Sequence, residues 1–427
     1  MDFLLRSSLN GLVSRGALEV VSASGTRFTV GDGSSAAVTV RFADRRAQWS
    51  LLLDPELRFG ELYMQGRLLV ERGTLYELLA LLVDNARHAQ VSPWLALFDR
   101  IRFARRRRRP RNDRERSQRN VAHHYDLGDA LYELFLDDDR QYSCAYFEHP
   151  QQSLEAAQLA KKRHITAKLN VEPGHSVLDI GCGWGGLALY LAGIAEAGKV
   201  AGITLSQEQL KTAATRARQQ GLDDRVGFSL TDYREMQGSF DRIVSVGMFE
   251  HVGPASYETY FRHARRLLKD DGIMLLHTIG CTGVPAHADP WLDKYIFPGG
   301  YVPALSQMMP AIEASGLVVS DIEVLRLHYA STLRAWRERF AAARHSALAL
   351  ALGDERFCRM WEYYLAFCET VFRYDDIVVF QVLLAPRNDT VPLTRDYIAA
   401  QEARLRAREQ LVHAPDAATS RLRAIGS

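Results

Sequence analysis

A glycine-rich loop that follows an apolar stretch is the segment whose residue types most directly suggest chemistry. It runs from Asp179 through Gly181, Gly183 and Gly185 to Gly186. Glycines at such positions tolerate unusual backbone dihedrals and let the main chain approach a ligand closely. Gly181, Gly183 and Gly186 fit the pattern GxGxxG, so a dinucleotide-binding dehydrogenase is one interpretation. A purely structural turn capped by an aspartate is another.

Asp179 distinguishes these interpretations because it stands at the strand end, two residues before the first glycine. A carboxylate beside the loop attracts an ammonium or sulfonium group, whereas it would repel the pyrophosphate that the start of a helix otherwise binds. The sequence therefore favours a cationic cofactor, S-adenosylmethionine, over a nicotinamide dinucleotide.

The second strand of the same unit lacks the acid that usually contacts the ribose hydroxyls of a nucleoside cofactor. That acid is expected about 20 residues after the loop, but residues 200–206 read VAGITLS. Thr204 and Gln209 are polar substitutes within reach, and Asp232 after the third strand could serve the adenine edge.

The elements that must position these residues begin near residue 121, where helices give way to strand–helix alternation typical of a parallel sheet covered on both faces. Strands are expected at 175–180, 199–205, 226–230, 240–247, 272–278, 317–326 and 377–385. Helices are expected near 185–193, 206–220 and 256–268, with a long helical stretch over 332–372. Seven strands with the last pair partly antiparallel make a Rossmann-like α/β sheet of the class I methyltransferase type, with helical insertions.

A smaller α+β unit is expected before this sheet. Residues 20–53 alternate in short bursts interrupted by glycine and serine, which predicts short strands and turns, and helical leucine spacing follows. The expected division is a small unit at 1–98, an Arg-rich linker at 99–120, the large domain at 121–390, and a tail at 391–427 that forms an exposed helix and a frayed end.

Nine short blocks occur in a fixed order between about residues 120 and 387. They are HYD at 124–126, YSCAYF at 142–147, LDIGCGWGG at 178–186, GITLSQEQ at 202–209, DYR at 232–234, SVGMFEHVG at 245–253, LLHTIG at 275–280, KYIFPGGYVP at 294–303 and HYASTLRAW at 328–336. Together they resemble the cyclopropane fatty acid synthase family, which includes the mycolic acid cyclopropane synthases. The unit at 1–98 resembles, more weakly, a small lipid-associated domain that some members carry.

The resemblance implies a reaction in which an unsaturated phospholipid acyl chain attacks the cofactor methyl group, and the resulting carbocation loses a proton and closes to a cyclopropane. A bound bicarbonate ion serves as the base. Its implied ligands are Cys144, Glu250, His277, Tyr329 and the backbone of Ile279. The implied cofactor contacts are Tyr142, Ser143, Asp179, Gly181, Gly183, Thr204, Gln209 and Asp232. The family also suggests a homodimer.

Topology supports part of this assignment independently. Glu250 follows the fourth expected strand and His277 ends the fifth, so both belong at the carboxyl edge of the sheet, where α/β ligand sites form. A cluster of Glu, His and Cys also invites a metal, but no short ligand spacing supports one. An anion held by hydrogen bonds is preferred. A cation intermediate further requires an apolar pocket that excludes water, and aromatic residues stand near the relevant motifs: Tyr142, Tyr146, Phe147, Phe249, Tyr295, Phe297 and Tyr301.

Basic charge is concentrated in one segment although the whole chain carries only +2. Residues 101–119 hold ten arginines against Asp113 and Glu115. Arg105 to Arg109 form either a solvated linker or a patch that binds an anionic surface, phospholipid or nucleic acid. Five scattered cysteines without CxxC spacing, no secretory signal and no long apolar span favour a cytoplasmic protein associated peripherally with the inner face of the membrane.

Rival functions share some of these features. A small-molecule N-methyltransferase could use the same scaffold, and the acyl product could be methyl- or methylene-branched instead of cyclic. A nucleic acid methyltransferase acting on exocyclic amines usually carries Asn/Asp-Pro-Pro-Tyr/Phe after the fourth strand, whereas this chain has Met248, Phe249, Glu250 and His251, so no nucleic acid partner is expected. A lipid-binding protein without catalysis is the alternative from another class.

Overall fold

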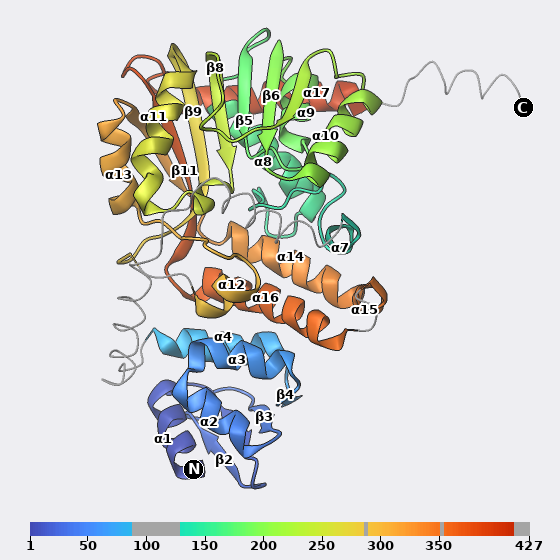
Figure 1. Cartoon of the computed structure of the whole chain (residues 1–427), viewed down its shortest axis with the longest axis vertical. Helices are drawn as coiled ribbons and strands as arrows, with labels where there is room; N and C mark the ends of the chain where they lie inside the picture. The colour runs from blue at the N-terminus through green and yellow to red at the C-terminus, as the bar shows by residue number, and fades with distance from the viewer. Residues whose placement is uncertain (88–128, 286–288, 351–353, 414–427) are drawn as a thin grey trace, which may run out of the picture.

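The computed structural model describes residues 1–87, 129–285, 289–350 and 354–413. Two sheets lie at opposite ends of the molecule, and a layer of helices lies between them (Figure 1). The Arg-rich run at 105–109 and the block at 124–126 lie outside the described residues. Within the described residues, no helix has the length and hydropathy of a membrane-spanning segment.

The N-terminal unit is a four-stranded sheet with helices packed against it. Its strand order is β2-β1-β3-β4, in which β1 and β3 are parallel and the other neighbours antiparallel. Alternate residues of β2 are exposed and buried, as expected for a half-buried strand. The elements are α1 (Asp2–Leu12), β1 (Leu18–Val21), β2 (Arg27–Val30), β3 (Val38–Phe42), α2 (Arg45–Leu53), α3 (Pro55–Met64), β4 (Leu68–Arg72) and α4 (Leu75–Ala86).

Helix α2 corrects the expectation of strands and turns throughout 20–53. It begins because the Asp44 side chain accepts a hydrogen bond from the Ala47 amide at 2.9 Å, which satisfies one of the free amides of the first turn. Its buried residues Ala47, Gln48 and Leu51 then follow helical spacing.

The large sheet has the seven strands expected from the sequence, in the order β10-β11-β9-β8-β5-β6-β7. Strands β9, β8, β5, β6 and β7 are parallel, and β11 is antiparallel to both of its neighbours. Only β9 differs clearly in length, because it pairs with β8 from Leu268 onward. The strands are β5 (Ser176–Ile180), β6 (Lys199–Thr204), β7 (Val226–Leu230), β8 (Phe240–Val246), β9 (Leu268–Cys281), β10 (Val318–Val324) and β11 (Ile377–Ala385).

Each face of this sheet is covered by helices and forms its own apolar core. One core joins β5 and β6 to α8 (Leu154–Lys168), α9 (Gly186–Gly193) and α10 (Gln207–Gln219). The other joins β8, β9 and β11 to α11 (Tyr257–Leu267) and α13 (Leu305–Ala314). These are the layers of a doubly wound α/β fold.

A helical insertion lies between the two sheets (Figure 1). It contains α12 (Pro290–Tyr295), α14 (His328–Ala342), α15 (Arg344–Leu350) and α16 (Glu355–Tyr374), with the short α7 (Asp129–Glu133) beside it. Its core includes the fully buried Trp336 and Trp361. Helices α3 and α4 of the N-terminal unit pack on α16, and Glu61 accepts hydrogen bonds from Lys294 Nζ at 2.6 Å and Tyr295 Oη at 2.8 Å. The N-terminal unit is therefore joined to the large sheet through this insertion.

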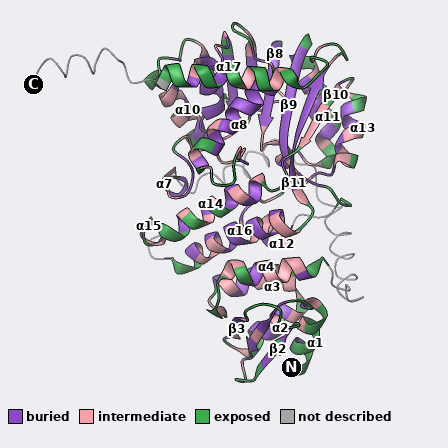
Figure 2. Cartoon of the chain, turned by 180° about the vertical axis from the view of Figure 1, so that it is seen from behind, coloured by how far each residue is buried: buried purple, intermediate pink, exposed green. Residues whose placement is uncertain are grey.

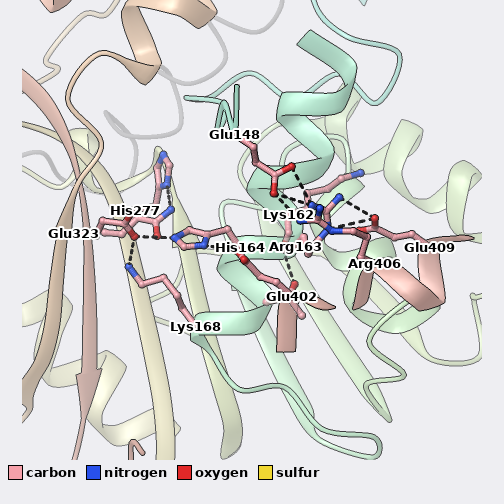
Figure 3. Close-up of polar contacts among 12 residues, drawn as sticks. Glu148, Lys162, Arg163, His164, Lys168, His277, Glu323, Glu402, Arg406 and Glu409 are labelled. Atoms are coloured by element: carbon pink, nitrogen blue, oxygen red, sulfur yellow. Dashed lines mark hydrogen bonds and ion pairs between the residues drawn. The ribbon is translucent and has the colours of Figure 1, made fainter. Parts of the chain in front are cut away.

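Helix α17 (Asp396–His413) is the tail helix that the sequence predicts, and most of its residues are exposed, but one face of it packs on the large domain. It lies along α8 on the back of the sheet (Figure 2), where Leu405 and Glu409 are buried. Figure 3 shows Arg163 of α8 between Glu409 and Glu148. Arg163 Nη2 lies 2.9 Å from Glu409 Oε2, and Tyr190 Oη donates to Glu409 Oε1 at 2.6 Å. A helix with alternating charges has the same sequence pattern whether it is fully solvated or packed on one face. The sequence therefore does not predict this packing.

Replacing Glu409 with alanine is expected to lower the free energy of unfolding by about 3 kcal/mol, because the buried Arg163 guanidinium loses its main partner. This is the lower end of the usual range, since Glu148 remains within reach of Arg163. Urea denaturation measures the change, and Gln410→Ala, an exposed position on the same helix, is the matched control. Equal stability of the two variants would contradict the structural role of α17.

Candidate active site

The glycine loop connects β5 to α9 in a conformation that only glycine adopts easily. Gly181, Gly183 and Gly185 all have positive φ angles, and the amides of Gly181 and Cys182 both donate to the Ile203 carbonyl, at 2.9 and 3.0 Å. A Cβ atom on Gly181 would lie 2.9 Å from Met248 Cβ, closer than real Cβ contacts. The loop thus lies directly against the segment that follows β8.

A cavity of about 150 Å³ opens at this loop, at the carboxyl edge of β5, β6 and β8. All eight residues that the sequence analysis expected at the cofactor line it: Tyr142, Ser143, Asp179, Gly181, Gly183, Thr204, Gln209 and Asp232. They come from four separated parts of the chain, and the parallel sheet brings them to one edge.

Asp179 lies inside this cavity with one oxygen unsatisfied. The residue is almost completely buried, and among the described residues its Oδ2 has no hydrogen-bond partner. Burial raises the pKa of the carboxyl group to about 7, and the charge of nearby Lys161 opposes the rise. A buried carboxylate without a partner is costly unless a donor or cation reaches it, so this side of the cavity suits a cationic ligand.

The polar residues after β6 and β7 are held by local hydrogen bonds. Thr204 Oγ1 donates to Gln209 Oε1 at 2.8 Å. This bond uses the amide oxygen of Gln209, and the amide nitrogen is the donor of the same side chain. Asp232 accepts from Arg234 Nε at 2.8 Å and Nη2 at 2.6 Å. The Asp232 carboxylate is therefore ion-paired with Arg234, which fixes its orientation as a hydrogen-bond acceptor.

Glu250 lies beside this cavity in the short helical turn η1 (Phe249–His251) after β8. Its Oε1 accepts from the Ile279 amide at 2.6 Å, whereas its Oε2 is buried and has no hydrogen-bond partner in the described part of the chain. Burial raises the pKa of the carboxyl group to about 7. The backbone of Ile279 was expected to contact a bound anion, and in this structure its amide donates to Glu250 instead.

His277 is on β9, two residues before Ile279, so both side chains point to the same face of the sheet. Gln381 Nε2 lies 3.2 Å from His277 Nδ1, and an amide nitrogen can only donate. Nδ1 is therefore the acceptor, and Nε2, buried and unpartnered among the described residues, carries the proton. Burial lowers the pKa of His277 well below its usual value, so the ring is neutral.

Cys144 and Tyr329 belong to the buried core of the helical insertion, against which Ile279 packs. The Cys144 thiol donates to the Ala145 carbonyl at 3.3 Å, and burial raises its pKa, so it is a thiol and not a thiolate. The centroids of the Tyr329 and Phe372 rings lie 4.6 Å apart. No hydrogen bond joins His277 directly to the other four expected residues in the described part of the chain.

The five expected catalytic residues do not line the cavity, but residues close in sequence to two of them, Cys144 and Glu250, do. Ser143 precedes Cys144, and Met248 and His251 flank Glu250. The cavity and the buried acid are therefore adjacent. Of the aromatic residues singled out earlier, Phe249 is fully buried in the core beside α11, and Tyr146 stacks on the rings of His164 and His328. No group of three or more metal-binding side chains occurs within the described residues.

Lys161 is the residue at this site that the sequence did not reveal. It is on α8, lines the cavity, and its Nζ donates to Ser143 Oγ at 2.7 Å. A lysine in a helix with several other charges is normally solvated, and only the near-complete burial of α8 shows otherwise. His251 also lines the cavity, and burial lowers its pKa to about 4.

The strand order, the glycine loop at the carboxyl edge and the acid at the end of β5 define the class I fold of S-adenosylmethionine-dependent methyltransferases. A family model described as mycolic acid cyclopropane synthetase matches residues 112–382, and the chain belongs to this family. The resemblance drawn from the nine sequence blocks is thereby confirmed.

The chain is also similar in sequence to individual relatives. The chain is 48% identical over 265 residues to the cyclopropane-fatty-acyl-phospholipid synthase of Escherichia coli strain K12, covering 61% of this chain and 66% of that one. It is 38% identical over 284 residues to the tuberculostearic acid methyltransferase UfaA1 of Mycobacterium tuberculosis, covering 64% and 66%. In both cases the match spans just under two thirds of the relative.

A solved structure aligns over a similar region. The crystal structure of mycolic acid cyclopropane synthase CmaA1 complexed with SAH and CTAB has a TM-score of 0.59 and 34% identity, covering 62% of this chain and 97% of that one. The match therefore takes in nearly all of that structure and a little over three fifths of this chain.

The affinity for S-adenosylhomocysteine is expected to increase as the pH rises from 5.5 to 7.5, by roughly tenfold or more, because Asp179 becomes ionised over this range and then attracts the ligand ammonium group. His251, with a pKa near 4, does not titrate in this range. Calorimetric titration measures the trend. The variant Asp179→Asn should bind more weakly and with a much smaller pH dependence, of which the remainder comes from Glu250 beside the cavity. An undiminished slope in that variant would contradict the assignment.

Proposed function

We propose that the chain transfers a one-carbon unit from S-adenosylmethionine to the double bond of an unsaturated phospholipid acyl chain and forms a cyclopropane. The observation that carries this proposal is a buried acid, Glu250, with an unsatisfied oxygen beside a cavity suited to a cationic ligand. Family membership and the relatives' names support it.

The cavity fits the cofactor by the chemistry of its lining. Asp179 offers an unsatisfied carboxylate oxygen to an ammonium group, and Gln209 and Thr204 are polar groups at the end of β6, where a ribose would lie. The bound cofactor supplies an electrophilic methyl group on sulfur. The chain's own contribution is to align the acyl double bond with that methyl group and to exclude water.

The reaction requires removal of one proton. The alkene forms a carbon–carbon bond to the methyl group as the carbon–sulfur bond breaks, and the acyl chain becomes a cation. Loss of a proton from the transferred methyl group lets the ring close, so the lipid gains CH2 overall. A bicarbonate ion, when bound, would supply the base.

Two orphaned polar atoms fit such an anion. Glu250 Oε2 can accept from, or when protonated donate to, a bicarbonate oxygen, and the protonated His277 Nε2 is a donor. The Cys144 and Tyr329 side chains belong to the buried core against which Ile279 packs, and the Cys144 thiol donates to the Ala145 carbonyl. The Ile279 amide becomes available to the anion only if Glu250 turns away from it, because Glu250 accepts its hydrogen in this structure.

A branched product is the second candidate. One relative at 38% identity is named as a tuberculostearic acid methyltransferase, and the branched and cyclic products diverge only after the common cation. Mass spectrometry of lipid fatty acids incubated with the protein and labelled cofactor separates them. A gain of CH2 with a ring is expected, whereas a methyl or methylene branch would favour the alternative and an unchanged lipid profile would refute both.

The phospholipid substrate resides in a membrane, and the N-terminal unit offers a surface that suits one. Helices α1 and α2 adjoin, since Gln48 Nε2 donates to Asp2 Oδ1 at 3.4 Å. They expose apolar side chains, with Phe3 at 79% and Leu53 at 64% exposure, and two arginines that form no ion pair within the described residues. This α1–α2 face consists of Phe3, Leu4, Arg45, Arg46, Trp49 and Leu53. We include peripheral binding to anionic bilayers in the proposal.

The variant Glu250→Gln is expected to lose at least about 100-fold in lipid methylation, because the amide cannot carry the negative charge or accept a proton in the same way. Its affinity for S-adenosylhomocysteine should stay within about twofold of wild type, since Glu250 does not line the cavity. Glu258→Gln, an exposed acid on α11, is the control. A parallel loss of cofactor binding would show that Glu250 belongs to the cofactor site.

Neutralising Arg45 and Arg46 to glutamine is expected to weaken binding to vesicles containing anionic phospholipid by about 30-fold at low salt, since each basic residue contributes about 1 kcal/mol near such a surface. Co-sedimentation measures this, with Lys211→Gln and Arg218→Gln on α10 as a charge-matched control. A separate variant with Arg105 to Arg109 neutralised tests the Arg-rich run. Unchanged binding in both variants would refute peripheral binding through basic residues.

A further inference from the structure

Lys161 has an unusual environment for a lysine. Its exposed fraction is 0%, and its Nζ makes one hydrogen bond in the described part of the chain, to Ser143 Oγ at 2.7 Å. An ammonium group carries three donors, so two remain unused. Burying an ammonium group with so few acceptors is costly unless a ligand supplies the rest.

Two other lysines of α8 show what a satisfied buried lysine looks like in this protein. Lys168 Nζ lies 2.9 Å from Glu323 Oε2, and Lys162 Nζ lies 2.6 Å from Asp139 Oδ2. Each therefore has a carboxylate partner. Within the described residues Lys161 has no carboxylate within ion-pair distance, although it is as deeply buried as Lys168 and the charge of the buried Asp137 acts on it.

The cavity that Lys161 lines also contains the unsatisfied carboxylate of Asp179. The two charges influence one another, but no ion pair between them occurs within 4.0 Å in the described structure. A cavity that keeps a cation and an anion apart, each incompletely satisfied, is complementary to a ligand that carries both charges. The α-amino acid end of S-adenosylmethionine is such a group, with an ammonium and a carboxylate on one carbon.

Ser143 connects Lys161 to this ligand end. Because the ammonium group donates to Ser143 Oγ, the serine hydroxyl hydrogen is turned away from Lys161 and remains available as a donor. The serine is held in place by its carbonyl, which accepts from Gln158 Nε2 at 3.0 Å. A fixed hydroxyl donor beside an ammonium group is suited to an anionic oxygen.

We propose that Lys161 and Ser143 form the subsite for the carboxylate of the cofactor's amino acid end, opposite Asp179, which receives the ammonium group. Ser143 contacts the carboxylate, and Lys161 orients the serine hydroxyl and supplies the compensating positive charge. This inference rests on the proposed function, because it assumes that the ligand of the cavity is an adenosyl amino acid.

The test compares three ligands that differ only at this end: S-adenosylhomocysteine, its decarboxylated analogue, and methylthioadenosine, which lacks both charged groups. Calorimetry measures their binding to the full chain and to Lys161→Met. The variant should bind S-adenosylhomocysteine about 10- to 100-fold more weakly and bind the other two within about twofold of wild type. Ser143→Ala should show the same ligand-specific loss, and Lys162→Met, the matched buried lysine, should show none.

The outcomes separate this inference from the proposed function. Unchanged methylthioadenosine binding reports that the variant cavity is folded, and if Lys161→Met does not fold, Ser143→Ala provides the same comparison. An equal loss for all three ligands, or no loss for any, would overturn the carboxylate subsite while leaving the proposed function in place. A wild-type chain that binds none of the three would overturn the proposed function itself.

Discussion

The parallel alignment of β6, β5, β8 and β9 is the constraint on which the candidate site depends. Asp179 pairs in register with Gly202 on one side and Val244 on the other, and His277 pairs with Val246. Parallel strands release their carboxyl ends at one edge. The glycine loop, Thr204, Glu250 and His277 therefore meet there although they are distant in sequence, and the helical insertion covers that edge (Figure 1).

The same insertion links the site to the N-terminal unit. Tyr142, which lines the cavity, lies with its hydroxyl 2.7 Å from that of Tyr364 on α16, and α16 packs against α3 and α4. A single helix thus contacts the cavity wall on one side and the small sheet's helices on the other.

The sheet and the cavity lining could be predicted because their signals are local. Strands buried on both faces appear as apolar runs, and the order of strand, acid, glycines and helix defines the loop without reference to the rest of the chain. Asp179, Gly181 and Gly183 were assigned from that order, and Thr204, Gln209 and Asp232 from their places after the next two strands. Tyr142 and Ser143 were assigned from motifs whose order matched a family. For the same reason Glu250 and His277 could be placed at the carboxyl edge from topology alone.

Features that depend on distant partners could not be predicted. Lys161 looks like a surface residue until α8 is seen to be buried along most of its length and Lys161 to line the cavity. The packing of α17 on α8 becomes visible only when Arg163 is found to pair with Glu409. The hydrogen bond from the Ile279 amide to Glu250 joins two segments 29 residues apart, and neither motif indicates it. In each case the arrangement depends on the free energy of burying a charged group. That burial is produced by segments distant in sequence.

The two incompletely satisfied charges in the cavity, Asp179 and Lys161, have a consequence for how the protein is maintained. An apolar or neutral pair at these positions would cost less to bury, so keeping two buried charges is a stability–function trade-off whose cost a dipolar ligand offsets when it binds. Such a protein is most vulnerable to unfolding and proteolysis when its ligand is scarce. Its cellular abundance would then follow the supply of that ligand.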